Sequence, residues 1–286
     1  MPDKKKRAPH SAIRNPNSEI SSAAPTITLT TDFGSSDYFV GSVKGVLLRH
    51  DPSLRLVDIT HEIAPQDLIS AAFILKEISL YFPAKTVHLA VVDPGVGTDR
   101  RRLIAAERDQ LYVAPDNGLL TYILQRVGCR VFSVEEAHLP LKKSPTFAGR
   151  DQFAPIAARL AAGVSQERLG RKIDDPVLMN GLSPRREGTQ VVGKIVYFDR
   201  FGNAITNLTA DHLDRTADPD ALLLRLKGKR LAGLKRHYAE GKRGAGNLII
   251  NSSGHLELFV PGGSARDLLK LHLLDEVFVE AQKPVH

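Results

Sequence analysis

The stretch Val87-His88-Leu89-Ala90-Val91-Val92-Asp93-Pro94-Gly95-Val96-Gly97-Thr98-Asp99-Arg100 is the part of this sequence that decides the fold. Its apolar, β-branched start ends at Asp93, and short apolar runs bounded by Gly and Pro predict buried strands. Open α/β sheets bind ligands at the carboxyl ends of their strands, and the turn after Asp93 could bring Arg100 back to that carboxylate. Taken alone, the segment favours an ordinary strand-to-helix loop with solvated arginines.

Strand and helix patterns alternate around this stretch, and we expect order to begin near Thr26. Apolar spacing predicts strands at 27–30, 54–59, 87–92, 103–106 and 111–114. Helical spacing predicts helices at 38–50, 67–82, from 116–118 to Gly128, and at 152–162. Strands alternating with helices indicate an α/β domain, with a mostly parallel sheet covered by helices on both faces.

After about Gly170 the pattern changes to short strands, predicted at 191–198, 204–208, 221–226, 247–250, 256–260 and 276–280. Few helix signals accompany them, so this part is typical of a small β-barrel or sandwich. We therefore expect a disordered basic tail at 1–25, an α/β domain at 26–175, a linker at 176–190 and an all-β domain at 191–284.

The chain has 286 residues and a net charge of +7, but its first 25 residues hold five Lys/Arg against two Asp/Glu. The rest of the charge is spread out and Trp is absent, whereas nucleic acid binding favours a basic patch with aromatic platforms. We therefore expect no nucleic acid partner. The run Lys4–Arg7 is more typical of a disordered tail than of a targeting signal or a nucleic-acid-binding arm.

The only cysteine, Cys129, can form no disulfide within the chain, which fits a reducing compartment and a cytoplasmic location. A small, partly buried residue is a better interpretation of it than a catalytic thiol. No apolar run approaches the ~18 residues that span a bilayer, so no membrane association is expected. The basic N-terminus lacks the apolar core of a secretory signal.

Carboxylates follow the first predicted strand at Asp32 and Asp37. Ionised carboxylates only accept hydrogen bonds, so the two could hold ribose hydroxyls or an ammonium group. Asp37 could equally cap the following helix. In the all-β part, Asp199 and Asn203 flank Gly202, which is typical of a turn, although Asn could also clamp an adenine edge.

Other common site patterns are missing from the sequence. The ten histidines show no metal-binding HExxH or HxH spacing, so no metal is expected, and no phosphate-binding GxGxxG or Walker pattern is complete. No GxSxG nucleophile elbow appears.

Six ordered motifs together resemble one family, the S-adenosyl-L-methionine hydroxide adenosyltransferases, which are related to the fluorinases and chlorinases. The motifs are Thr31-Asp32-Phe33-Gly34-Ser35-Ser36-Asp37, Val92-Asp93-Pro94-Gly95-Val96-Gly97, Ala114-Pro115-Asp116-Asn117-Gly118-Leu119-Leu120, Thr146-Phe147, Phe201-Gly202-Asn203 and Asn251-Ser252-Ser253-Gly254. The resemblance covers nearly everything after the tail. It implies an α/β domain, a small C-terminal β-barrel, and a homotrimer with its site between neighbouring subunits.

The resemblance also implies the reaction: water or hydroxide attacks the ribose 5′ carbon of S-adenosylmethionine, methionine leaves, and adenosine forms. The sulfonium is already a good leaving group, so the substrate needs no cofactor or metal beside it. Catalysis would come from placing the water in line and removing its proton.

Residue roles follow from the same resemblance. Asp32 would hold the ribose hydroxyls, Asp37 the methionine ammonium, and Ser252 and Ser253 the methionine carboxylate. The remaining substrate-binding residues would be Phe147, Asp199 and Asn203, Tyr238 packed on the adenine, and the backbone at Val260 and Gly262.

Asp93 and Arg100 match two members of the family's water-handling Asp-Arg-His set, but Ala148 stands where the family has the histidine. Alanine cannot accept a proton, so we expect weakened hydrolysis with substrate binding kept. The alanine is either natural or a deliberate replacement of the kind used to trap substrate, which we favour. The alternatives are a sensor that binds S-adenosylmethionine or adenosine without turnover, and a halogenase. The halogenase is disfavoured because Asp93 would repel a halide.

Overall fold

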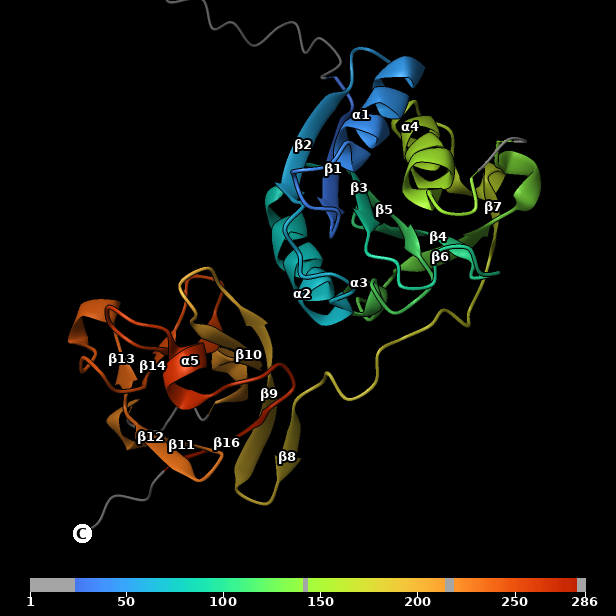
Figure 1. Cartoon of the computed structure of the whole chain (residues 1–286). Helices are drawn as coiled ribbons and strands as arrows, with labels where there is room; N and C mark the ends of the chain where they lie inside the picture. Colours follow the sequence, from blue (N-terminus) through green and yellow to red (C-terminus); the bar gives the residue numbers. More distant parts are fainter. Residues whose placement is uncertain (1–23, 141–143, 214–218, 282–286) are drawn as a thin grey trace, which may run out of the picture.

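The computed structural model describes residues 24–140, 144–213 and 219–281, which form two domains joined by an extended segment (Figure 1). The predicted tail at 1–25, apart from its last two residues, lies outside the described residues, and so do the Lys4–Arg7 run and the predicted end of the second domain at residue 284.

A seven-stranded sheet forms the centre of the first domain, counted over the described residues, in the order β2-β1-β3-β5-β4-β6-β7. Its strands are β1 (Thr26–Thr31), β2 (Arg55–Thr60), β3 (Val87–Val91), β4 (Arg102–Glu107), β5 (Gln110–Pro115), β6 (Arg130–Val134) and β7 (Gly170–Lys172). β2, β1, β3 and β5 are parallel neighbours, whereas β4 and β7 run against their neighbours. The mostly parallel α/β fold expected from the sequence is thus confirmed.

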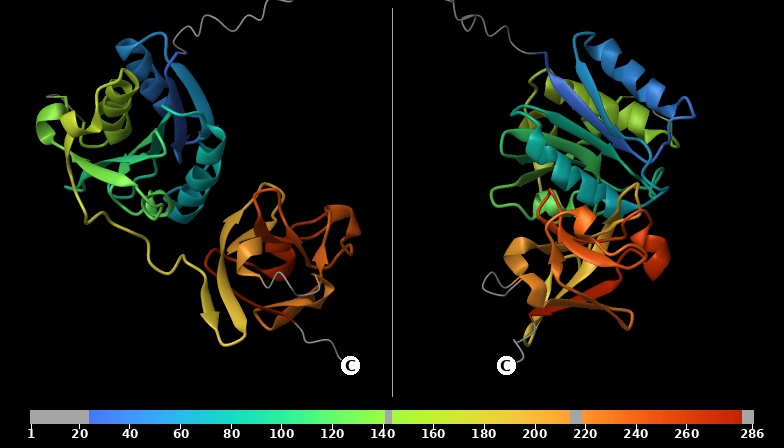
Figure 2. Two further views of the ribbon diagram at one scale, coloured as in Figure 1. Left: turned by 180° about the vertical axis from the view of Figure 1, so that it is seen from behind. Right: turned by 90° about the vertical axis from the view of Figure 1, so that its left-hand side faces the viewer.

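Helices cover both faces of this sheet, as the two further views show (Figure 2). They are α1 (Phe39–His50), α2 (Leu68–Ile78), α3 (Thr121–Leu124) and α4 (Ala154–Ala161), with short turns η1 (Ser79–Tyr81), η2 (Glu136–His138) and η4 (Gln166–Arg168) and the π-helical turn η3 (Gly149–Phe153). In the described part of the chain, no helix has the length and apolar character needed to cross a membrane.

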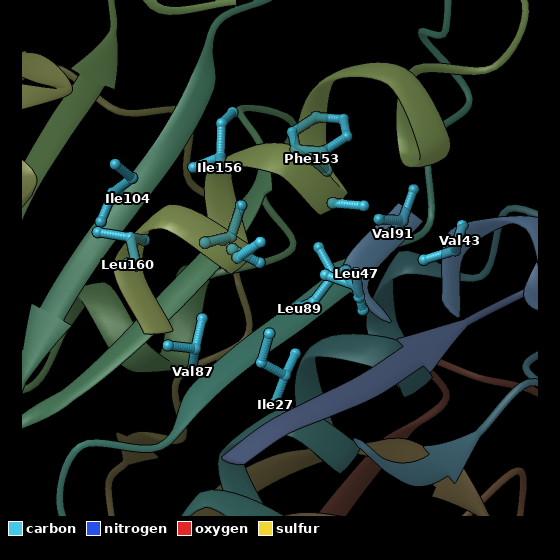
Figure 3. Close-up of a cluster of buried hydrophobic side chains, with 14 of the residues drawn as sticks. Ile27, Val43, Leu47, Val87, Leu89, Val91, Ile104, Phe153, Ile156 and Leu160 are labelled. Carbon is cyan, nitrogen blue, oxygen red and sulfur yellow. The ribbon is translucent and has the colours of Figure 1, made fainter. Parts of the chain in front are cut away.

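The main core of the first domain lies between the sheet and the helices α1 and α4 (Figure 3). Ile27 and Leu29 of β1 point to this side, since alternate residues of a strand face the same way. They meet Val43 and Leu47, four residues apart on one face of α1. The opposite face of the sheet packs against α2 and α3.

The predicted helix from 116 to 128 is wrong in its extent, because only Thr121–Leu124 is helical. The Asn117 side chain donates from Nδ2 to the Val92 carbonyl at 2.9 Å and accepts from Leu119 N at 3.1 Å. Gly118 has φ +95°, a left-handed conformation that an α-helix excludes. Strands β6 and β7 were not predicted from the sequence.

The described part of the second domain forms a nine-stranded, nearly closed sheet in the order β12-β11-β16-β9-β10-β15-β14-β13, with β8 paired to β9. Its elements are β8 (Arg185–Glu187), β9 (Gln190–Phe198), β10 (Ala204–Thr209), η5 (Ala210–His212), η6 (Pro219–Ala221), β11 (Leu222–Leu226), β12 (Lys229–Ala232), β13 (Leu234–Lys235), η7 (Tyr238–Glu240), β14 (Asn247–Ile250), β15 (His255–Phe259), α5 (Ala265–Leu269) and β16 (Glu276–Ala281). This barrel-like sheet agrees with the predicted all-β domain.

The predicted linker at 176–190 is shorter than expected, because β8 pairs with β9 and so belongs to the second domain. The extended remainder is fixed to both domains. Val177 N donates to Asp116 Oδ1 at 2.7 Å, and Asn207 Nδ2 donates to the Leu182 carbonyl at 2.7 Å.

Helix α2 also packs against the second domain, near β9 and β10 in Figure 1. The Phe73 ring stacks on Tyr197 with centroids 5.5 Å apart. His255 Nδ1 lies 2.8 Å from the Thr206 carbonyl, and its Nε2 lies 3.1 Å from Glu77 Oε1. The interface therefore joins an aromatic contact to a buried polar one.

A buried histidine makes the stability of the first domain depend on pH. His88 on β3 is fully buried, bonds through Nδ1 to Thr28 Oγ1 at 2.8 Å and stacks on Tyr112. Burial lowers the pKa of His88 to about 4. Between about pH 6.5 and pH 4, this histidine is protonated in the unfolded chain but stays neutral in the folded chain. The free energy of unfolding therefore falls as the pH drops through that window.

We expect this residue to contribute a loss of up to about 3 kcal/mol in unfolding free energy across that window. His88→Phe keeps the ring and removes the titration, so urea unfolding of this variant should depend less steeply on pH than that of the unchanged chain. His50→Asn, at an exposed position, serves as the control and should leave the slope unchanged. An equal slope for His88→Phe and the unchanged chain would contradict the expectation.

Candidate active site

Two carboxylates emerge side by side at the carboxyl edge of the first sheet. β1 and β3 are parallel neighbours, and their register pairs Thr31 with Val91. Asp32 directly follows the one strand, and Asp93 follows the other after Val92. Adjacent strands lie about 4.8 Å apart, so the two acidic loops share one edge of the sheet, where ligands bind in open α/β folds.

Arg100 binds Asp93 through two hydrogen bonds, so the interpretation of this segment as a loop with solvated arginines is wrong for Arg100. Its Nε donates to Asp93 Oδ1 at 2.6 Å, and its Nη2 donates to Oδ2. The two side chains are only 8% and 6% exposed, so little of this bidentate pair faces bulk solvent. The guanidinium also lies over the Phe153 ring, 5.2 Å from its centroid.

The turn between the paired residues is closed by backbone hydrogen bonds. Val96 N donates to the Asp93 carbonyl at 3.2 Å, and Thr98 N donates to the Gly95 carbonyl at 3.1 Å. A Cβ on Gly95 would lie 3.4 Å from Arg100 Cδ and 3.4 Å from Thr98 Oγ1. A side chain at position 95 would therefore press on the arginine that holds Asp93.

Ala148 lies beside this pair, buried at the start of the π-helical turn η3. It lines a cavity of about 380 Å³ together with Arg100, Arg102, Gln152 and six other residues. Two positions of the expected water-handling set, Arg100 and Ala148, thus border one cavity, and the third, Asp93, is bonded to Arg100 without lining it. That proximity leaves their catalytic role a prediction.

Phe147 joins an aromatic cluster at the end of β1. Its ring makes edge-on contacts with Phe33 and Phe39, at centroid distances of 6.1 and 5.4 Å. The Arg150 guanidinium lies 4.7 Å from its centroid. A Cβ on Gly149 would approach Phe33 Cζ to 3.1 Å, so the glycine lets this turn pack on the loop after β1.

The loop after β1 presents its two carboxylates differently. Asp32 Oδ2 accepts from Gln66 N at 2.8 Å, so this side chain also fixes the loop before α2. Asp37 is exposed, and α1 begins after Tyr38 without a capping bond from any side chain in the described residues. The capping alternative for Asp37 is therefore wrong.

The second domain holds a cavity of about 510 Å³ that brings together five of the predicted residues. It is lined by Asp199, Phe201, Asn203, Tyr238, Phe259, Val260, Pro261, Gly262 and Gly263. Tyr238 is 48% exposed, and its ring packs edge-on against Phe259. The cavity thus combines aromatic rings, a buried amide and backbone groups.

Both carboxylate oxygens of Asp199 accept hydrogen bonds from the turn that follows it. Its Oδ1 accepts from the backbone N–H groups of Phe201 and Asn203, at 2.9 and 2.8 Å. Its Oδ2 accepts from Asn203 Nδ2 at 2.9 Å. The carboxylate therefore fixes the Asn203 amide, whose oxygen accepts no hydrogen bond from another residue that the structure describes.

A buried carboxyl, that of Glu257, accepts a hydrogen bond from Tyr238. Tyr238 Oη donates to Glu257 Oε1 at 3.0 Å, and Asn251 Nδ2 donates to Oε2 at 3.0 Å. Burial raises the pKa of Glu257, and burial with that neighbouring carboxyl raises the pKa of Tyr238 to about 12. Sequence reasoning missed Glu257, which stands out only as a charged residue within an apolar strand.

Ser252 and Ser253 do not line this cavity. They are exposed in the turn between β14 and β15, whereas Val260 and Gly262 follow the opposite end of β15. Asn251 Oδ1 accepts from Ser253 N at 3.0 Å and so shapes the turn.

Two other predicted features concern metal and thiol chemistry. In the described residues, no three His, Cys, Asp or Glu side chains gather where a metal could bind. Cys129 is half-buried, and burial raises the pKa of its thiol to about 11. A thiol of that pKa stays protonated and unreactive at neutral pH.

Comparisons with known proteins agree across both domains. Models of the SAM hydroxide adenosyltransferase N-terminal and C-terminal domains match residues 27–170 and 193–278. An (R)-S-adenosyl-L-methionine hydrolase of Thermus thermophilus is 40% identical over 250 residues, covering 84% of this chain and 94% of that protein. A fluorinase of Actinoplanes sp. is 28% identical over 268 residues, covering 82% and 90%.

A solved structure gives the same picture. The crystal structure of an uncharacterized conserved protein from Thermotoga maritima matches with a TM-score of 0.82 at 35% identity. The match covers 89% of this chain and 99% of that one.

The buried pair predicts a specific pattern of stability changes. Arg100→Met leaves the Asp93 carboxylate buried without its charged partner, so urea unfolding should show a loss of about 3–5 kcal/mol. Adding Asp93→Asn removes the stranded charge and should recover much of this loss. Arg130→Met is the control, because it breaks an exposed pair with Glu167 and should cost about 1 kcal/mol or less. Equal losses for Arg100→Met and the control would contradict a buried pair.

Proposed function

The chain belongs to the S-adenosyl-L-methionine hydroxide adenosyltransferase family, and we propose that its geometry serves the hydrolysis of S-adenosyl-L-methionine to adenosine and L-methionine. The observation that carries this proposal is the buried Asp93–Arg100 pair after β3, whose arginine lines a cavity. Such a pair can hold and deprotonate a water without help from a covalent nucleophile.

In the proposed step, the water oxygen attacks the ribose 5′ carbon while the bond from that carbon to the sulfonium sulfur breaks. The electron pair of the broken bond stays on sulfur, which becomes the neutral thioether of methionine. The water gives up one proton to Asp93 and then to solvent. Charge and atoms balance, and S-adenosylmethionine enters as the substrate without a cofactor.

Asp32 and Asp37 are proposed to bind the rest of the substrate. Asp32 keeps Oδ1 free of bonds to the described residues, so it can accept from a ribose hydroxyl while Gln66 holds Oδ2. Asp37 is exposed and does not cap α1, which leaves its carboxylate able to meet the methionine ammonium. Phe147 would close the apolar side of the site.

The cavity of the second domain is proposed to take the adenine. Asn203, fixed by Asp199, offers its amide oxygen to the base edge, and Tyr238 offers a ring for packing. The backbone at Val260 and Gly262 borders the same space. Ser252 and Ser253 lie outside it, so we assign them to the methionine carboxylate of the substrate.

We propose that the two cavities form one site between neighbouring subunits of a homotrimer. The residues lining the first belong to the α/β domain and those lining the second to the barrel domain. Phe201 at the mouth of the second is 76% exposed, which suits a surface that a neighbouring subunit covers.

We expect the rate of S-adenosylmethionine hydrolysis to be lower than in a chain with histidine at position 148, because the Ala148 side chain neither accepts a proton nor orients water. The same residue favours the second candidate, a protein that binds S-adenosylmethionine or adenosine without turnover. The halogenase alternative has less support, since the fluorinases are more distant relatives and Asp93 is an acidic neighbour for a halide.

Replacing the proposed base should separate these functions. Asp93→Asn should lower adenosine release from S-adenosylmethionine at least about a hundredfold, because it removes the proton acceptor. Substrate affinity measured by calorimetry should change little. The exposed Asp174→Asn serves as the control.

Three outcomes would contradict the proposal. Full activity of Asp93→Asn would remove Asp93 from the chemistry. Tight binding without adenosine, from both the unchanged chain and Ala148→His, would favour the sensor. A 5′-chloro nucleoside formed in the presence of chloride would favour a halogenase.

Mixing two inactive variants should test the shared site. Asp93→Asn damages the α/β half and Asn203→Ala the barrel half, so each alone should be inactive or weak. Co-expressed, they should form trimers containing some sites with both halves intact, and adenosine release should recover. Mixed trimers without recovered activity, or a monomer by sedimentation, would refute a site between subunits.

A further inference from the structure

Gln152 lies one turn after Ala148 on the same side of the chain. The turn that carries them, η3, is π-helical, with Ala154 N bonded to the Gly149 carbonyl. Such turns are uncommon and often mark functional sites. Both residues are buried and both line the 380 Å³ cavity beside Arg100. The Gln152 amide therefore borders the space that a histidine at position 148 would share.

The orientation of this amide is fixed by its neighbour. Arg102 Nε lies 2.6 Å from Gln152 Oε1, and a guanidinium has donors only. The oxygen of the amide must therefore face Arg102, and the Nε2 donors face the other way. No other described residue bonds to them. A buried amide that makes one good bond and keeps its donors free is suited to hold a water.

The cavity is large enough for this role. One water occupies about 30 Å³ in the liquid, so a space of about 380 Å³ holds several. Arg102 Nη1 also lies 3.5 Å from Glu136 Oε2, so the arginine that orients Gln152 contacts both side chains. Glu136, Arg102 and Gln152 thus contact one another in series, and all three line the cavity.

We propose that Gln152 positions the attacking water in place of the absent histidine. Its Nε2 donates to one lone pair of the water, which leaves the other lone pair for the 5′ carbon and a hydrogen for Asp93. Glutamine cannot take a proton, so Asp93 remains the only base and turnover stays below that of a histidine-bearing chain. This inference rests on the proposed function and explains how that function survives Ala148.

Four proteins test it: the unchanged chain, Gln152→Met, Ala148→His, and the double variant. Gln152→Met keeps the size of the side chain and removes the donors. In the unchanged background it should lower kcat about tenfold or more with KM little altered, a factor equivalent to about 1.4 kcal/mol of transition-state stabilisation. In the Ala148→His background, the same change should cost less than about threefold, because the imidazole then holds the water.

A pH profile adds a readout that a structural role would not move. Glutamine does not titrate, so kcat of the unchanged chain should lack a step near pH 6.5 that Ala148→His gains. Gln152→Ala repeats the test should the methionine variant fold poorly, and thermal melting checks both. Gln166→Met, a half-buried glutamine remote from the cavity, is the matched control and should retain activity.

The possible outcomes distinguish a failure of the role of Gln152 from a failure of the proposed hydrolase function. Equal effects of Gln152→Met in both backgrounds, or none in either while Asp93→Asn is inactive, would overturn the role of Gln152 and leave the hydrolase intact. An inactive unchanged chain with an active Ala148→His would also overturn it. No adenosine from any of the four would instead refute the proposed function.

Discussion

A buried, bidentate ion pair between Asp93 and Arg100 is the constraint on which this structure depends. Two charges removed from water are tolerated only when their geometry is good and their remaining bonds are satisfied. Here the turn after β3 is closed by backbone bonds, Gly95 leaves room for the arginine, and Phe153 lies beneath its guanidinium. Strand β3, the turn after it and the π-helical turn η3 must all be in place before the pair can form.

Polar chemistry and binding surface are divided between the domains. The strand ends of the α/β domain supply carboxylates and arginines around small cavities, which suits a charged leaving group and a water. The barrel domain supplies aromatic rings and a fixed amide, which suits a flat, neutral base. In the barrel domain, the hydrogen bonds of Asp199 both shape its turn and fix the Asn203 amide.

Much of this was accessible from the sequence, because strand alternation and helix spacing are local. The approach of Arg100 to Asp93 was open from the sequence, since the glycine- and proline-containing turn allowed it, but the segment alone favoured solvated arginines. Strands β8, β12 and β13 escaped prediction because they are short and polar, and are stabilised by pairing with distant segments. Gln152 was seen only as the start of a helix, since its role depends on Arg102, a partner 50 residues away.

Helix α2 has every residue buried or half-buried, although only one of its faces lies on the sheet. Its other face, with Ile69 and Phe73, is covered by β9 and β10. Dissecting the chain at its connecting segment would strip this cover and leave an apolar, aromatic strip in contact with water. An exposed strip of this kind favours association with other apolar surfaces, so the barrel serves the α/β half as a permanent cover.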